Sequence, residues 1–345
     1  MKNILFKSLM LFAFFFLYEK NSNAQDIHFS QFYETPLLRN PALAGIFSGD
    51  FRLQAVYRNQ WNSVTVPYQT TSLNAEYKLP VGHGDDFLTI AGEILYDKSG
   101  TVALTATHVL PVLNYHKSLS AERNMYLSAG FSAGIVQRKI DRSKITTNSQ
   151  FGSNGYDPTL SNGETFPNAG YLYFDGSAGL SFNSQIGENP DNNIYFGVAY
   201  QHFNKSAKVS FYNSPDVELV PKIVFSSGVK MSVNDYAFLT FYADYSKQGV
   251  NTEMIGGMLY SVKLDDPTEP HNIISGGAFI RWNDAIIPVV KFDVKPLTFA
   301  FSYDVNISGL KTASQGQGGF ELSLSYQKYF DRNNSSRDAV RCPRF

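Results

Sequence analysis

From Phe51 almost to the end of the chain, apolar and polar residues alternate with a period of two. The stretch 320–327 shows the pattern most clearly. Its apolar face holds Phe320, Leu322, Leu324 and Tyr326, and its polar face holds Glu321, Ser323, Ser325 and Gln327. Successive side chains of a β-strand point to opposite faces, so this period predicts strands and an all-β chain.

Runs of this kind recur about fourteen times, and most are about ten residues long, which is the length a tilted strand needs to cross a bilayer. An even number of antiparallel strands also suits a closed bacterial barrel. We expect strands near 51–58, 68–79, 87–97, 102–115, 125–137, 172–183, 193–203, 220–232, 236–247, 252–263, 272–282, 285–294, 297–307 and 318–328.

Composition favours a membrane barrel over a soluble β-sandwich, although a sandwich also has alternating strands. Charged residues make up 17% of the chain and aromatic residues 15%, against roughly 25% charged residues in ordinary globular proteins. An outer wall that faces lipid and carries interfacial aromatic girdles has this composition. The sequence therefore predicts a transmembrane outer-membrane β-barrel of about fourteen antiparallel strands.

Residues 1–24 have the features of a cleaved signal peptide. Lys2 and Lys7 form a basic start, residues 9–18 are apolar, and Ser22 and Ala24 are small residues at the expected cleavage site. The apolar run is too short to span a bilayer as a helix. Export followed by removal of this segment is the expectation.

The rest of the chain divides into three parts. Residues 25–50 contain Pro and Gly and predict turns with at most one short helix, forming a pre-barrel segment or plug. The barrel is expected over 51–330, followed by a short C-terminal tail, 331–345, with both termini in the periplasm. The long polar connection 141–169 predicts an extracellular loop or one folded into the lumen.

The sequence offers little catalytic chemistry. No HExxH, P-loop or CxxC motif occurs, and the single cysteine, Cys342, excludes an intramolecular disulfide. The net charge of −1 gives no basic field for nucleic acid. Asp85–Asp86 and Asp265–Asp266 fit solvated turns better than calcium loops. We therefore expect that the protein is not an enzyme and that it has no catalytic residues, no cofactor and no metal site.

Charges of both signs lie on the face expected to line the lumen. They favour either internal salt bridges that hold a segment inside the barrel or simple solvation of the lumen. The inward-facing charges are Arg52, Arg58, Glu76, Lys78, Glu93, Lys230, Asp244, Glu253, Arg281, Lys291, Asp293 and Glu321.

Four stretches, taken in order with the barrel pattern, resemble the PorP/SprF family of the type IX secretion system of Bacteroidetes. They are the QDIHFSQFY stretch from Gln25 to Tyr33, the NPALAG stretch from Asn40 to Gly45, the YRNQW stretch from Tyr57 to Trp61, and the CPRF end from Cys342 to Phe345. The resemblance covers essentially the whole mature chain.

The resemblance implies an outer-membrane protein of the secretion and gliding motility machinery. It implies contact with outer-membrane lipids and with a periplasmic ring made of a lipoprotein and its associated protein. It also implies help in exporting or surface-anchoring an adhesin-like protein through that protein's C-terminal sorting domain. The alternative hypothesis is an outer-membrane channel for small or hydrophobic solutes with an N-terminal hatch.

Two sets of residues are expected to bind partners or to hold the plug. Arg58 and Trp61 are placed to anchor the plug, by a charge-assisted hydrogen bond and by aromatic burial, although Trp61 fits an interfacial belt equally well. The basic tail is placed to dock on the acidic surface of a partner, although it fits a loosely ordered chain end equally well. The full set is Phe29, Ser30, Gln31, Asn40, Pro41, Arg58, Asn59, Gln60, Trp61, Arg341, Cys342, Pro343, Arg344 and Phe345.

Overall fold

Fourteen antiparallel strands close into one barrel in the computed structural model. The model describes residues 26–63, 65–82, 85–165, 167–204, 210–212, 219–309 and 311–330. The first and last strands pair with each other, from Phe51 opposite Lys328 to Gln60 opposite Gly319, so the sheet has no free edge. The predicted transmembrane barrel of about fourteen strands is confirmed.

Each barrel strand pairs with its neighbours in sequence, and the predicted strands match the observed ones to within a few residues. Two further short strands, β6 and β7, form a separate hairpin. The barrel strands are β1 (Phe51–Gln60), β2 (Tyr68–Pro80), β3 (Phe87–Ser99), β4 (Leu104–Ser120), β5 (Met125–Lys139), β8 (Gly170–Gln185), β9 (Asn193–Gln201), β10 (Lys222–Asn234), β11 (Ala237–Gln248), β12 (Asn251–Lys263), β13 (Asn272–Arg281), β14 (Ala285–Val294), β15 (Leu297–Asn306) and β16 (Gln317–Lys328).

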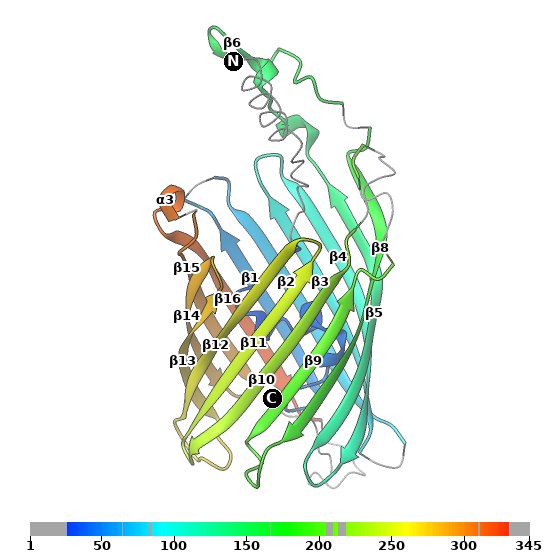
Figure 1. Ribbon diagram of the computed structural model, residues 1–345, viewed down its shortest axis with the longest axis vertical. Coiled ribbons are helices and arrows are strands. Elements are labelled where there is room, and N and C mark those ends of the chain that lie inside the picture. Colours follow the sequence, from blue (N-terminus) through cyan, green and yellow to red (C-terminus); the bar gives the residue numbers. More distant parts are fainter. Residues whose placement is uncertain are drawn as a thin grey trace, which may run out of the picture.

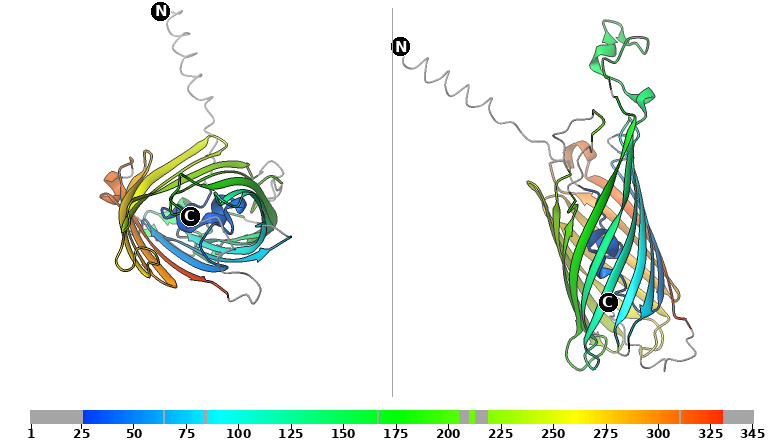
Figure 2. Two further views of the ribbon diagram at one scale, coloured as in Figure 1. Left: turned by 90° about the horizontal axis from the view of Figure 1, so that it is seen from below. Right: turned by 90° about the vertical axis from the view of Figure 1, so that its right-hand side faces the viewer.

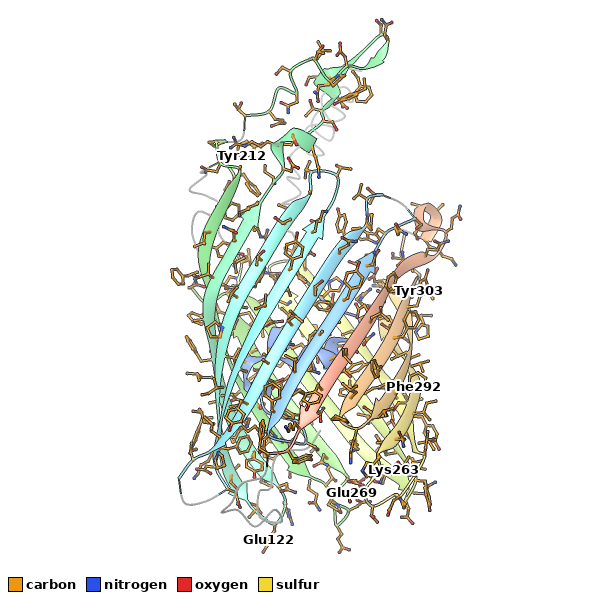
Figure 3. All side chains as sticks on the ribbon, turned by 180° about the vertical axis from the view of Figure 1, so that it is seen from behind. Glu122, Tyr212, Lys263, Glu269, Phe292 and Tyr303 are labelled. Atoms are coloured by element: carbon orange, nitrogen blue, oxygen red, sulfur yellow. The ribbon has the colours of Figure 1, made fainter. Side chains whose placement is uncertain are left out.

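The period of two separates an apolar outer wall from a polar inner one. On β16, Glu321 is 1% exposed while its neighbour Leu322 is 47% exposed. Phe292 projects from the outer wall in Figure 3, whereas Glu122 and Glu269 lie at one rim. Exposed apolar side chains around the barrel suit contact with lipid tails, and the polar residues face the lumen.

None of the helices in the described parts of the chain is both long and apolar enough to cross a bilayer.

The two ends of the barrel differ, as Figure 1 shows. At one end, called here the loop end, the 140–169 connection projects beyond the strands and carries β6 (Phe151–Gly152) and β7 (Gly155–Tyr156). The short helix α3 (Lys311–Ser314) lies at the same end. At the other end, called the turn end, β10 and β11 are joined by a tight turn and β16 finishes. Of the two positions expected for the 141–169 connection, the structure shows the projecting one.

Residues 26–50 lie inside the barrel (Figure 2, left, blue). They hold three short helices rather than one: η1 (Phe32–Glu34), α2 (Pro36–Arg39) and η2 (Pro41–Leu43). Each proline begins its helix, where the missing N–H removes no intrahelical hydrogen bond. Asn40 caps η2, because its side chain accepts a hydrogen bond from the backbone N–H of Ala42.

Candidate functional site

The segment 26–50, called the plug from here on, runs through the lumen from one end of the barrel to the other. At the loop end, the backbone N–H of Asp26 donates to Oε1 of Gln248 over 3.2 Å. At the turn end, the backbone N–H of Asp50 donates to the carbonyl of Lys328 over 2.9 Å. The sequence predicts both termini in the periplasm, and therefore on the same side of the barrel. Instead, the first and last described residues lie at opposite ends, because the plug passes through the whole lumen.

Apolar side chains of the plug pack against opposite walls of the barrel. The Phe32 ring meets Phe279 on β13 edge to face, with 5.5 Å between centroids, and Tyr33 stacks on Tyr242 of β11 at 4.9 Å. On the other side, Phe29 packs with Val56 of β1 and Leu95 of β3, and Leu37 and Ala44 pack with Ala91 of β3 and Val112 of β4. Contact with both sides means that the plug bridges the lumen between opposite walls of the barrel.

Arg58 is the centre of a buried ion-pair cluster that ties the plug to the wall. It is 1% exposed, and its guanidinium lies 3.0 Å from Oε1 of Glu321 and 3.1 Å from Oδ2 of Asp304. The Glu321 carboxylate in turn accepts the backbone N–H groups of Ser30 and Gln31, over 2.6 and 2.7 Å. The plug backbone is therefore held by a charge-assisted hydrogen-bond pair.

Arg281 completes this cluster. Its Nη2 lies 2.6 Å from Oδ2 of Asp304, and its Nη1 donates to the Ser30 hydroxyl over 2.9 Å. Ser30 itself donates to Asp304 over 2.8 Å. Two arginines thus face two carboxylates out of contact with bulk water, which is the condition under which buried charges are tolerated.

The two charged residues of the helical part of the plug each meet an opposite charge on a strand. Arg39 makes a two-pronged contact with Asp244 of β11, with Nε 2.5 Å from Oδ2, and its Nη2 donates to the Tyr195 hydroxyl. Glu34 accepts from Lys291 of β14 over 2.8 Å and from Gln54 of β1 over 3.0 Å. Charges on the plug and on the wall are therefore complementary.

The backbone of η2 lies directly on the wall formed by β4, β5, β8 and β9. Asn114 donates to the carbonyls of Ala42 and Ala44, and the Ser181 hydroxyl also donates to Ala42. Gly130 of β5 makes this approach possible, because a Cβ at that position would lie 2.4 Å from the nitrogen of Ala42. The glycine serves close backbone packing rather than a turn.

Near the turn end, further polar contacts hold the plug. The N–H of Gly45 donates to Glu76 over 2.7 Å, and Glu76 pairs with Arg52. Lys78 donates to the carbonyl of Phe47 and lies 4.2 Å from the centre of its ring. These contacts combine hydrogen bonds to charged groups with a cation–π contact.

At the loop end, His202 lies between two carboxylates. Its Nδ1 is 2.8 Å from Asp175, and its Nε2 is 3.3 Å from Asp26 of the plug. Burial alone lowers the pKa of His202, but the hydrogen bonds to Asp175 and Asp26 outweigh it and raise the pKa to about 9. A protonated His202 therefore holds the first residue of the plug at neutral pH.

The sequence-predicted residues fall into three groups in the structure. Phe29, Ser30, Gln31, Asn40, Pro41 and Arg58 all lie where the plug meets the wall. Asn59 donates to the Tyr57 hydroxyl, Gln60 lies against Arg58, and the Trp61 ring packs on Tyr68 at 4.7 Å at the loop end. This position of Trp61 agrees with the interfacial alternative. Arg341, Cys342, Pro343, Arg344 and Phe345 lie outside the described residues.

Several residues of the site were not anticipated from the sequence. Asp304 follows Ser302 by two positions on the polar face of β15, so extending the alternation would have found it. Glu34 and Arg39 are charges within an apolar segment, which signals buried partners. Asp26 and His202 carry no such pattern, because their contact joins residues far apart in the chain.

No group of three His, Cys, Asp or Glu side chains that could hold a metal ion occurs among the residues that the structure describes. Asp86 of the Asp85–Asp86 pair instead fixes a turn. It accepts hydrogen bonds from Lys117, Tyr115 and the N–H of Ser118. The hydrogen bond from Lys117 is the largest cause that lowers the pKa of Asp86, to about 2.

A closed barrel with an apolar exterior and a lumen occupied by its own N-terminal segment defines an outer-membrane β-barrel protein of the plugged type. Comparison of the sequence with family models identifies the family within this class. A family model described as type IX secretion system membrane protein PorP/SprF matches residues 21–326, so the chain belongs to the PorP/SprF family. The resemblance noted from the four sequence stretches is thereby confirmed.

Solved structures share the barrel fold at low sequence identity. A TodX monoaromatic hydrocarbon channel mutant is 9% identical with a TM-score of 0.50, covering 86% of this chain and 94% of that chain. The toluene transporter TbuX of Ralstonia pickettii is 12% identical with a TM-score of 0.47, over 86% and 94% of the two chains. These likenesses concern the fold alone. A comparison with curated proteins finds no match.

Proposed function

We propose that this protein is a closed scaffold of the type IX secretion and gliding motility machinery. It helps to export or surface-anchor an adhesin-like protein, which it engages through that protein's C-terminal sorting domain. It also contacts the periplasmic ring lipoprotein and its associated protein, and it acts without catalysis or a cofactor. The proposal rests on the family membership together with one observation, the plug that packs against opposite walls of the lumen.

A plug held against opposite walls of the lumen favours a scaffold over a channel. The runner-up function, conduction of small or hydrophobic solutes past an N-terminal hatch, requires the plug to leave its site. That movement would separate the Arg58 cluster, the Arg39–Asp244 pair and the Lys291–Glu34 pair. Breaking buried ion pairs is costly because it leaves uncompensated charges.

We further propose that the signal peptide, 1–24, is removed on export and that the turn end faces the periplasm. Short turns are typical of the periplasmic side of bacterial barrels, and long loops of the outer side. The turn between β10 and β11 and the projecting 140–169 connection fit this orientation. The basic tail, 331–345, would then start in the periplasm, within reach of the ring.

Deletion of 331–345 tests the docking role of the tail. The truncated protein is expected to assemble in the outer membrane but to lose co-purification with the ring proteins from native membranes. Deletion of the loop-end hairpin, 151–156, is the matched control and should keep that co-purification. If the tail deletion retains the ring proteins, the tail has no docking role. If the full-length chain retrieves no secretion component, the scaffold proposal itself fails.

A further inference from the structure

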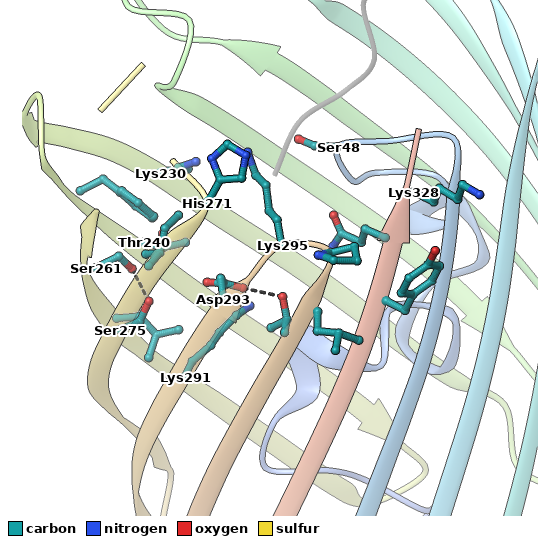
Figure 4. Close-up of a pocket in the computed structure, with 18 of the residues that line it drawn as sticks. Ser48, Lys230, Thr240, Ser261, His271, Ser275, Lys291, Asp293, Lys295 and Lys328 are labelled. Carbon is teal, nitrogen blue, oxygen red and sulfur yellow. Dashed lines mark hydrogen bonds between the residues drawn. The ribbon is translucent and has the colours of Figure 1, made fainter. Parts of the chain in front are cut away.

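A cavity of about 690 Å³ lies in the turn-end half of the lumen, beside the plug (Figure 4). Because η2 of the plug lies on β4, β5, β8 and β9, this opposite half is left open. Strands β10–β16 form its wall, and the turn residues Lys295 and Pro296, together with Tyr329 after the end of β16, lie at its mouth. Ser48 brings the plug to its edge.

The cavity is basic. Three lysines line it with their side chains, Lys230, Lys291 and Lys295, against a single carboxylate, Asp293. Lys328 also borders the cavity, but its ammonium lies 5.4 Å from the centre of the Phe330 ring on the outer face of the wall. Lys291 is paired with Glu34 of the plug, and Asp293 accepts a hydrogen bond from Thr298. Lys295 forms no ion pair with any residue that the structure describes. Lysines gathered on low-dielectric walls concentrate anions at the mouth.

Apolar side chains lie between the lysines. Phe238, Leu259, Ile273 and Leu297 line the same cavity, together with the ring of Tyr242. A small inorganic anion would leave this apolar surface exposed to water. A ligand that carries both carboxylates and apolar groups would cover it and meet the lysines.

The chain's own C-terminal tail is a poor occupant on grounds of charge. In the sequence it follows Phe330, one residue after Tyr329 of the cavity lining, but Arg332, Arg337, Arg341 and Arg344 outnumber its acidic residues Asp331 and Asp338. Like charges at close range repel, so a basic tail is not drawn into a lysine-lined cavity. The complementary ligand therefore comes from another molecule.

We propose that this cavity binds an acidic peptide segment, with apolar residues between its carboxylates, from a protein on the turn-end side of the membrane. The inference rests on the proposed function for the presence of such a partner in the periplasm. This contact is separate from the one proposed for the basic tail, because here the partner supplies an inserted segment rather than a surface. The tail would meet acidic surface on a partner, and the cavity would receive an acidic segment.

Binding of synthetic peptides to the full mature protein in detergent tests this inference. The probes are a fluorescent hexapeptide that alternates glutamate with leucine and its counterpart with glutamine in place of glutamate. The acidic peptide is expected to bind, with affinity that falls as salt is raised, and the glutamine peptide is expected to bind at least tenfold more weakly. Inorganic phosphate serves as the competitor.

Paired lysine substitutions locate the binding. The variant Lys230→Gln/Lys295→Gln is expected to weaken binding of the acidic peptide about tenfold, because two positive charges that face the cavity are removed. The variant Lys247→Gln/Lys311→Gln removes the same charge from exposed positions at the loop end and should leave binding unchanged.

Three outcomes overturn the inference: equal binding of both peptides, an unchanged affinity in the Lys230→Gln/Lys295→Gln variant, and displacement by phosphate at a concentration equal to that of the peptide. The last result would show a site for small anions only. Peptide binding without recovery of any secretion component from native membranes would keep the site and reject the scaffold function. Recovery of secretion components without peptide binding would keep the scaffold function and reject the site.

Discussion

Replacing Arg58 by methionine is expected to release the plug while leaving the barrel closed. Methionine keeps much of the volume but removes the guanidinium that bridges Glu321, Asp304 and the carbonyl of His28. Removing one partner of a buried ion pair costs about 3–5 kcal/mol, because the other charge stays buried.

The lower end of that range applies at this site. Asp304 keeps Arg281 at 2.6 Å, and Glu321 keeps the two backbone N–H groups of Ser30 and Gln31. A loss of about 3 kcal/mol changes the ratio of seated to released plug about 100-fold, since 1.4 kcal/mol corresponds to a factor of ten. The barrel strands keep their backbone pairing, so we expect its heat-modifiable migration on gels to persist.

Trypsin cleavage after Arg39 reads out the released state. Arg39 is 7% exposed inside the lumen, so the protease reaches it only after the plug has left. Cleavage of a transiently opened state follows the population of that state. Mass spectrometry should therefore show cleavage after Arg39 about 100-fold faster in Arg58→Met than in the wild type, and unchanged in the control variant Arg142→Met, whose side chain is exposed on the loop.

The double variant Arg58→Met/Glu321→Gln sharpens the test. It removes the carboxylate left without its guanidinium and keeps an oxygen for the Ser30 and Gln31 N–H groups, so it should be cleaved more slowly than Arg58→Met alone. Equal cleavage rates in the wild type and Arg58→Met would refute the assignment of Arg58 as the anchor of the plug.

Three further perturbations probe other contacts. Gly130→Val places a side chain against η2, where a Cβ already lies 2.4 Å from the nitrogen of Ala42, and should speed tryptic cleavage after Arg39, whereas Gly276→Val has open space around its Cβ and should not. Phe32→Ala removes a buried ring at a cost of about 3–5 kcal/mol and should lower the unfolding temperature. The folded-state pKa of His202 is raised from 6.5 to about 9, so its stabilisation is complete below pH 6.5 and is lost as the pH rises through 9. The wild type should therefore unfold at a higher temperature than His202→Gln at pH 6, and this advantage should vanish by pH 10; a constant difference would contradict the role of His202.

The strands were predictable because one physical rule acts at every position. Each residue of β1 or β16 faces either lipid or the lumen, so the sequence itself records the two faces, as Leu322 and Glu321 show. The same rule placed Arg58 and Glu321 on the inner wall. The ion pairs among these residues were left open, because alternation gives the face of a side chain but not its partner.

The course of the plug was not predictable in the same way. Residues 26–50 have no period, and their position is fixed by contacts with strands far along the chain, such as Ser30 with Asp304 and Arg39 with Asp244. Nothing local in the sequence states that Asp26 meets His202 at the loop end while Asp50 meets Lys328 at the turn end. These contacts are set by complementary charges on the plug and on the wall, and those charges come together only in the closed barrel.

The central claim is that the N-terminal segment closes this barrel. Single-channel recording of the purified wild-type protein in planar bilayers, beside an open outer-membrane porin under the same conditions, tests it most directly. We expect no current steps above baseline from this protein and regular steps from the porin. Stable, ohmic steps from the wild-type protein would show an open lumen and would contradict the account.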